Sequence, residues 1–168
     1  EYVDGKSVLA SLAMPSDEKV MESLKTTTYA SNKRPLGILY LLESKLRPNK
    51  KDSLKLRNFA EYSLEHLMPV KWQKWPKPQK NTEEQRNGGI KTIGNMALIT
   101  GQLNAAISNA VWKEKKEGKD GHQGLITYGA GLYTLESALK KDVWDEDAIV
   151  ERVNELGEKI LKIWKVKL

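Results

Sequence analysis

The sequence contains no cysteine, so the chain forms no disulfide and offers no thiolate ligand to a metal. It has no run of about 18 apolar residues, which argues against a membrane-spanning helix. A secretory signal pattern is also missing at its start. Together these absences predict a globular cytoplasmic protein, although the first residue is Glu1 rather than methionine, so the chain is expected to be part of a longer polypeptide.

The sequence also contains few histidines and no phosphate-binding glycine loop. The chain has two histidines, and His122 lies between glycines in a stretch that predicts an exposed loop. Gly88-Gly89 lacks the Gly-Lys-Ser/Thr pattern of nucleotide-binding loops. We therefore expect that these 168 residues alone neither bind nor hydrolyse nucleotides.

Basic residues, in contrast, are abundant. Lysine and arginine outnumber aspartate and glutamate by 28 to 22, which gives a net charge of +6. Such a charge favours a polyanionic partner, because basic side chains release counterions from nucleic acid. A surplus of lysine also keeps proteins soluble, so charge alone leaves nucleic-acid binding open.

Helical patterns dominate the chain and predict one mostly helical domain over residues 1–168. Val8, Leu9, Leu12 and Met14 suggest a short first helix, Ser16 is a good N-cap for a second, and Pro35 suits the start of a third. Asp145 is a good N-cap for a last helix whose apolar residues recur at helical spacing. We predict N-terminal helices over 1–60, a core over 61–118 and C-terminal helices over 119–168.

The core segment predicts a small strand pair. Tyr62, Leu64 and His66 alternate as in a short strand, and residues 90–100 form a second turn-and-strand segment in which Gly94 allows a backbone kink. Two prolines predict a long loop over 70–89, and a helix is expected from Thr100 to about Glu117. The expected class is α+β, mostly α, with a weak helix over 125–139.

Lysine and tryptophan alternate in the predicted loop, at Lys71, Trp72, Lys74 and Trp75. Ammonium groups bind phosphates and indoles stack on bases, so this mixture is typical of a nucleic-acid contact. Each tryptophan is equally compatible with a core anchor that pins the loop. Lys113 and Lys116, near the end of the helix expected after Thr100, are further candidates for nucleic-acid binding.

Glu65, His66, Asn95 and Asn104 carry groups suited to phosphodiester hydrolysis. A carboxylate and an amide oxygen are hard ligands that suit Mg²⁺ or Mn²⁺. A neutral imidazole takes a proton from water near neutral pH. At a frayed strand end, Glu65 and His66 would both reach a helix packed alongside, while Asn95 would accept the other ring N–H or hold the loop.

The order of these residues resembles the HNH, or His-Me finger, nuclease motif. The segments LEHLMP, IGNMALIT and GQLNAAISN carry the resemblance, and Asn95 and Asn104 keep its nine-residue step. RPLGILYLLESKL, NAAISNAVWKEKK and the final VWDEDAIVERVNELGEKILKIW resemble the C-terminal nuclease domain of GmrSD-type modification-dependent restriction endonucleases. That resemblance implies a ββα-metal core surrounded by helices.

The resemblance also implies residue roles. His66 matches the general base, Asn95 the asparagine that steadies it, and Glu65 and Asn104 the ligands of one Mg²⁺ or Mn²⁺ ion. Glu65 stands where many members have aspartate, and Asn104 where many have histidine, so a weaker ligand set is expected. Asn109 is predicted to be structural.

The implied function is cleavage of modified DNA in phage defence, with an NTPase and sensing domain N-terminal to this one in the same protein. One site cuts one strand, so a double-strand break needs a homodimer or two encounters. Two alternatives remain open: a non-catalytic nucleic-acid-binding module with a degenerate finger, and a nuclease directed at RNA.

Overall fold

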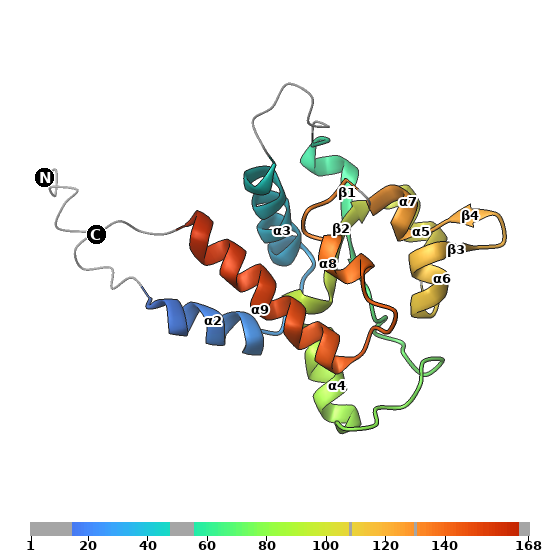
Figure 1. Ribbon diagram of the computed structural model, residues 1–168, viewed down its shortest axis with the longest axis horizontal. Coiled ribbons are helices and arrows are strands. Elements are labelled where there is room, and N and C mark those ends of the chain that lie inside the picture. The colour runs from blue at the N-terminus through green and yellow to red at the C-terminus, as the bar shows by residue number, and fades with distance from the viewer. Residues whose placement is uncertain (1–14, 48–55, 108, 130, 165–168) are drawn as a thin grey trace, which may run out of the picture.

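A computed structural model describes residues 15–47, 56–107, 109–129 and 131–164, and within them it is mostly helical, with two small antiparallel strand pairs (Figure 1). This confirms the predicted α+β, mostly α class. The helix suggested by Val8 to Met14 lies outside the described residues. None of the described helices has the length and apolar character needed to cross a membrane.

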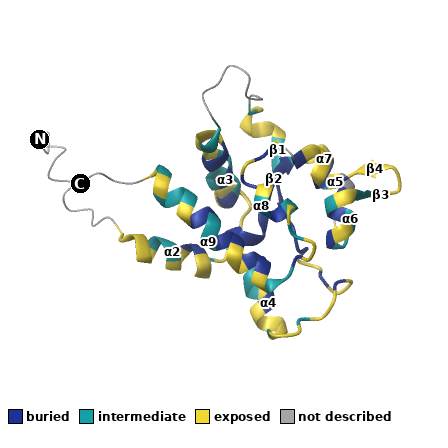
Figure 2. Cartoon of the chain, viewed as in Figure 1, coloured by how far each residue is buried: buried dark blue, intermediate teal, exposed yellow. Residues whose placement is uncertain are grey.

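The centre of the fold is the hairpin of β1 (Tyr62–His66) and β2 (Met96–Thr100). The strands are antiparallel, with Glu65 opposite Ala97 and His66 opposite Met96. Met96 and Leu98 belong to one core cluster, whereas Ala97 and Ile99 belong to the other. Both faces of β2 are therefore covered, which explains why the strand is a continuous apolar run (Figure 2).

Three helices cover the Met96 face of the hairpin: α2 (Asp17–Thr26), α3 (Lys33–Leu46) and α9 (Glu146–Ile163). The N-caps predicted at Ser16 and Asp145 are confirmed, since their side chains accept from the amides of Lys19 and Ala148. α2 and α9 run side by side in opposite directions (Figure 1). The last helix is thus docked on the hairpin core.

The second core cluster lies on the Ala97 face, and five short helices contribute to it or flank it. They are α4 (Glu83–Ile90), α5 (Gly101–Ile107), α6 (Trp112–Glu117), α7 (Leu125–Gly129) and α8 (Glu136–Leu139). Two 3₁₀ turns, η1 (Phe59–Glu61) and η2 (Ile93–Asn95), lead into the two strands of the hairpin.

Two sequence-based boundaries in this half were wrong. The loop expected over 70–89 becomes α4 from Glu83, because Thr82 and Gln85 form a reciprocal capping box. The helix expected from Thr100 to Glu117 is interrupted after Ile107, and Val111 adopts an extended conformation. This break brings Trp112 into the core, where its indole donates to the Lys141 carbonyl at 3.0 Å.

The glycine-rich stretch around His122 is also more ordered than predicted. Strands β3 (Gly118–Lys119) and β4 (His122–Gln123) form a tight hairpin. Asp120 and Gly121 both have positive φ, as a two-residue Asp-Gly hairpin turn requires. His122 itself is exposed, as expected from the sequence. The helix predicted over 125–139 is likewise divided into α7 and α8.

Gly94 allows a close approach between η2 and α9 rather than a backbone kink with positive φ. A β-carbon at Gly94 would lie 2.4 Å from the Ile149 carbonyl oxygen and 2.4 Å from a Val153 methyl carbon. The absence of a side chain therefore lets α9 pack directly against the residue before Asn95.

We expect Gly94→Ala to lower the free energy of unfolding by about 1–3 kcal/mol, because the added methyl group overpacks this contact. Gly88→Ala is the matched control: its β-carbon would meet nothing within 4 Å in α4, and alanine should add about 0.5–1 kcal/mol there. Urea denaturation of both variants tests this, and equal effects would contradict it.

Candidate functional site

The outer edge of β1 is capped by side chains from α5 and α6. The amide of Asn104 donates to the Leu64 carbonyl at 3.2 Å and to the Ser63 hydroxyl at 3.1 Å. Two residues further along, the ammonium of Lys115 donates to the His66 carbonyl at 2.7 Å. Alternate carbonyls of a strand point the same way, so the two side chains take the place of a third strand.

Glu65 and Lys115 form an ion pair at this edge. Glu65 is buried, and Lys115 is 0% exposed. Burial raises the pKa of the Glu65 carboxyl and lowers the pKa of the Lys115 ammonium, while the opposite charge of each partner opposes these shifts. Removing one partner would leave the other as an uncompensated buried charge.

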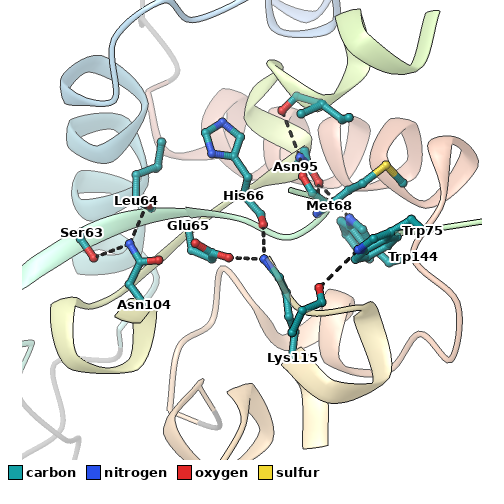
Figure 3. A network of polar contacts seen from close by, with 12 residues as sticks. Ser63, Leu64, Glu65, His66, Met68, Trp75, Asn95, Asn104, Lys115 and Trp144 are labelled. Atoms are coloured by element: carbon teal, nitrogen blue, oxygen red, sulfur yellow. Dashed lines mark hydrogen bonds and ion pairs between the residues drawn. The ribbon is translucent and has the colours of Figure 1, made fainter. Parts of the chain in front are cut away.

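His66 and Glu65 lie on opposite faces of β1. Figure 3 shows the His66 ring on one side of the strand, and Glu65, Asn104 and Lys115 on the other. The strand remains regular through His66, so the side chains alternate, and the frayed end expected from the sequence is not seen. The two groups therefore flank the end of the strand instead of facing the same helix.

The environment of His66 favours a neutral imidazole. Its pKa is lowered by burial first, and further by the positive charge of Lys115. The lower pKa keeps the ring unprotonated at neutral pH, the state that a general base needs.

Asn95 holds the backbone that follows β1. Its amide is completely buried; Oδ1 accepts from the Met68 amide at 2.8 Å and from the Trp144 indole at 3.0 Å. Nδ2 donates to the carbonyls of Met68 at 2.8 Å and Ile90 at 3.0 Å. None of these bonds reaches the His66 ring, so Asn95 makes the loop-holding contact and not the ring contact.

A buried arginine fixes the backbone on either side of Asn95. One guanidinium nitrogen of Arg152 donates to the Gly94 carbonyl at 2.6 Å and the Met96 carbonyl at 2.8 Å. The other nitrogen donates to the Thr134 carbonyl at 3.0 Å. Burial lowers the pKa of Arg152 to about 10, so its guanidinium is still charged near neutral pH. Helix α9 thus sets the position of the Asn95 turn.

The two predicted metal ligands lie on the same side of β1. Figure 3 shows the carboxylate of Glu65 and the amide of Asn104 on that side of the strand, and the Oδ1 of Asn104 makes no hydrogen bond within the described part of the chain. Among the described residues, no group of three or more His, Cys, Asp or Glu side chains is arranged so that it could hold a metal ion. The set fits a magnesium-type ion that takes its other ligands from water and phosphate.

Both tryptophans of the lysine–tryptophan loop are core residues. Trp72 and Trp75 are 6% and 7% exposed. Their indoles donate to the Asn87 side chain at 2.8 Å and to the Ala110 carbonyl at 3.3 Å, and the Arg86 guanidinium lies over the Trp72 ring. The base stacking predicted for these rings does not fit their burial, and the core-anchor alternative does.

The lysines predicted to contact nucleic acid differ in their surroundings. Lys71, Lys74 and Lys113 are exposed, and Lys113 borders a cavity of about 510 Å³ that Trp75 and Trp112 also line. Lys116 is only partly exposed, and its ammonium donates to the Lys141 carbonyl at 2.8 Å. The first three are therefore better placed than Lys116 to meet a phosphate backbone.

Comparison with known families supports the resemblance seen in the sequence. The model of the family described as GmrSD restriction endonucleases, C-terminal domain, matches residues 14–159. The chain belongs to this family. A comparison with curated proteins finds no match. The family match confirms the predicted relationship and identifies a restriction endonuclease domain; it assigns no role to any single residue.

Lys115 is the residue of this GmrSD C-terminal domain that reasoning from sequence missed. Only its neighbours Lys113 and Lys116 are singled out from the sequence, yet Lys115 is the lysine that is buried at the edge of β1. Its three-residue spacing from Trp112 was the available signal, since such residues share a helix face. This spacing is informative only when it is known that a new helix begins at Trp112.

Proposed function

We propose that this chain is a divalent-metal-dependent endonuclease domain that hydrolyses DNA phosphodiester bonds. In this proposal it is the cleavage domain of a phage-defence restriction protein that acts on modified DNA. The observation that carries the proposal is that Glu65, paired with Lys115, and Asn104 lie on one side of β1 near its end, while His66, whose pKa is lowered, lies on the other side (Figure 3). Membership of a restriction endonuclease family supports it.

Each group has a distinct task in this proposal. His66 accepts a proton from the attacking water, and Asn95 holds the backbone after His66 in place through its bonds to Met68. Glu65 and Asn104 would hold the Mg²⁺ or Mn²⁺ ion. The ion, when bound, stabilises negative charge on the phosphate and the leaving oxygen.

Because His66 and Glu65 flank the end of β1, we infer that the scissile phosphate lies across that end, within reach of both faces. The basic side chains that would meet the flanking phosphates come from the loop after Pro69 and from α6. Lys71, Lys74 and Lys113 are exposed, so they can bind phosphate without first leaving a buried contact.

The direct test is incubation of the purified 168-residue chain with plasmid DNA in Mg²⁺ or Mn²⁺, with EDTA as the metal-free control. We expect nicking with either ion, its loss in EDTA, and a strong reduction in Glu65→Gln. Parallel assays on single- and double-stranded DNA and RNA separate the alternatives. Salt-dependent binding without cleavage would support the non-catalytic module, and preferential RNA cleavage the RNA nuclease.

A second prediction concerns DNA affinity. Lys74→Ala should weaken binding and lower the slope of log K against log salt by about 0.9, the value for one lost phosphate contact. Lys162→Ala is the matched control, because Lys162 is exposed in the last turn of α9, and the C-terminal end of that helix lies far from the loop (Figure 1). Fluorescence anisotropy at several salt concentrations measures both slopes. An equal reduction in both variants would mean that the loop has no special role.

A further inference from the structure

Lys115 differs from every other described lysine in its burial. It is 0% exposed, whereas its neighbours Lys113 and Lys116 reach solvent on the same short helix. A buried ion pair contributes little net stability, because desolvation offsets the attraction between the charges. The small net stability that this pair contributes therefore does not explain why a positive charge is buried at the edge of β1.

The ammonium of Lys115 contacts the carboxylate expected to bind metal. It pairs with Glu65 and donates to the His66 carbonyl at 2.7 Å, and no other described acceptor receives its third N–H. Among the described residues, Glu65 is the only carboxylate that pairs with Lys115. An ammonium and a divalent ion at one buried carboxylate repel each other strongly, since the interior screens charge poorly.

We propose that the Lys115 ammonium neutralises Glu65 when no metal is bound, and that it competes with the divalent ion for this carboxylate. The inference rests on the proposed function, since it takes Glu65 as the metal ligand. It states that the ion binds Glu65 only after the Lys115 ammonium leaves it, so the ion is held weakly when DNA is absent.

The test is to measure Mn²⁺ binding to the chain without DNA by electron paramagnetic resonance. We expect Lys115→Met to bind Mn²⁺ at least tenfold more tightly than the wild type, and Lys115→Arg, which keeps the positive charge, to stay within about threefold of it. Glu65→Gln should abolish specific binding. Mn²⁺ should also raise the melting temperature of Lys115→Met more than that of the wild type. Equal or weaker binding by Lys115→Met overturns the proposal.

A second measurement avoids any folding defect in Lys115→Met, where Glu65 is left unpaired. In the wild type, ¹⁵N-labelled lysine allows the Lys115 ammonium resonance to be followed by NMR during a Mg²⁺ titration. We expect that signal to shift with the midpoint of ion binding, while the Lys113 signal stays in place. A Lys115 signal that does not respond while the ion binds overturns the proposal.

The outcomes separate this inference from the proposed function. Metal-dependent cleavage together with unchanged Mn²⁺ affinity in Lys115→Met rejects the competition alone. No cleavage, and no specific Mn²⁺ binding in either the wild type or Lys115→Met, rejects both.

Discussion

Replacing His66 by alanine is expected to lower the rate of DNA cleavage by about 100- to 10,000-fold, the usual contribution of a general base. The imidazole lies at the end of β1, opposite Met96, and its pKa is lowered by burial and by the nearby charge of Lys115. Nicking of supercoiled plasmid, followed at saturating Mg²⁺ or Mn²⁺, measures the change.

The protein provides its own control for this experiment. His122 is exposed on the β3–β4 hairpin, and no described residue forms a hydrogen bond with its side chain, so His122→Ala should cleave at the wild-type rate. Thermal unfolding of both variants checks that the fold survives. If His66→Ala folds and cleaves at the wild-type rate, His66 is not the base.

The lowered pKa of His66 also sets the direction of the pH dependence. The base must be neutral, so the rate should fall only when the pH drops through the pKa of the folded protein. Because that pKa lies below the ordinary value of about 6.5, the acidic limb of the profile should lie below pH 6.5. A limb above that value would contradict the environment described for the ring.

Local signals in the sequence predicted much of the fold. The N-caps at Ser16 and Asp145 and the alternation from Tyr62 to His66 depend on neighbouring residues, so they are readable without tertiary information. The capping box at Thr82 and the Asp120-Gly121 turn are equally local. The first begins α4, and the second joins β3 to β4. Both are absent from the sequence-based prediction, because prolines before Thr82 and glycines around His122 favour loops.

The candidate site was only partly predictable, because its contacts join distant segments. Asn104 reaches Ser63 across 41 positions, and Lys115 reaches Glu65 across 50. The family motif predicts that Glu65 and Asn104 act together, but the spacing of Lys115 from Trp112 separates it from the exposed lysines beside it only when the start of α6 at Trp112 is known. For Trp72 and Trp75, burial depends on where α4 and the Ala110 carbonyl lie, which no local pattern specifies.

The two faces of β1 pack against different core clusters, and this has a functional consequence. Glu65 shares its face with Ala97 and the short helices, whereas His66 shares its face with Met96, α3 and α9. A substrate at this end would therefore contact groups held by both core clusters. Any change that shifts one cluster against the other should separate His66 from Glu65, even without touching either residue.

Asn95 provides the most severe test of that dependence, because its side chain bonds to Met68, Ile90 and Trp144 of one cluster, while the next residue, Met96, packs in the other. Asn95→Ala should lower the free energy of unfolding by about 3–5 kcal/mol, since four buried partners lose their hydrogen bonds at once. Those partners are the amide and carbonyl of Met68, the Ile90 carbonyl and the Trp144 indole. Chemical denaturation measures the loss.

DNA cleavage by Asn95→Ala, measured well below the melting temperature of this variant, distinguishes a structural role of Asn95 from a direct role in the reaction. If Asn95 acts only by holding the backbone after His66, activity should fall together with stability. Asn109→Ala should change neither, because Asn109 is exposed and its side chain forms no hydrogen bond with the described residues, contrary to the structural role predicted from the sequence. Loss of cleavage with unchanged stability would instead give the Asn95 amide a direct part in the reaction. The four bonds that it makes inside the protein favour the first result, because an amide with both its oxygen and its nitrogen engaged has little capacity left for a substrate.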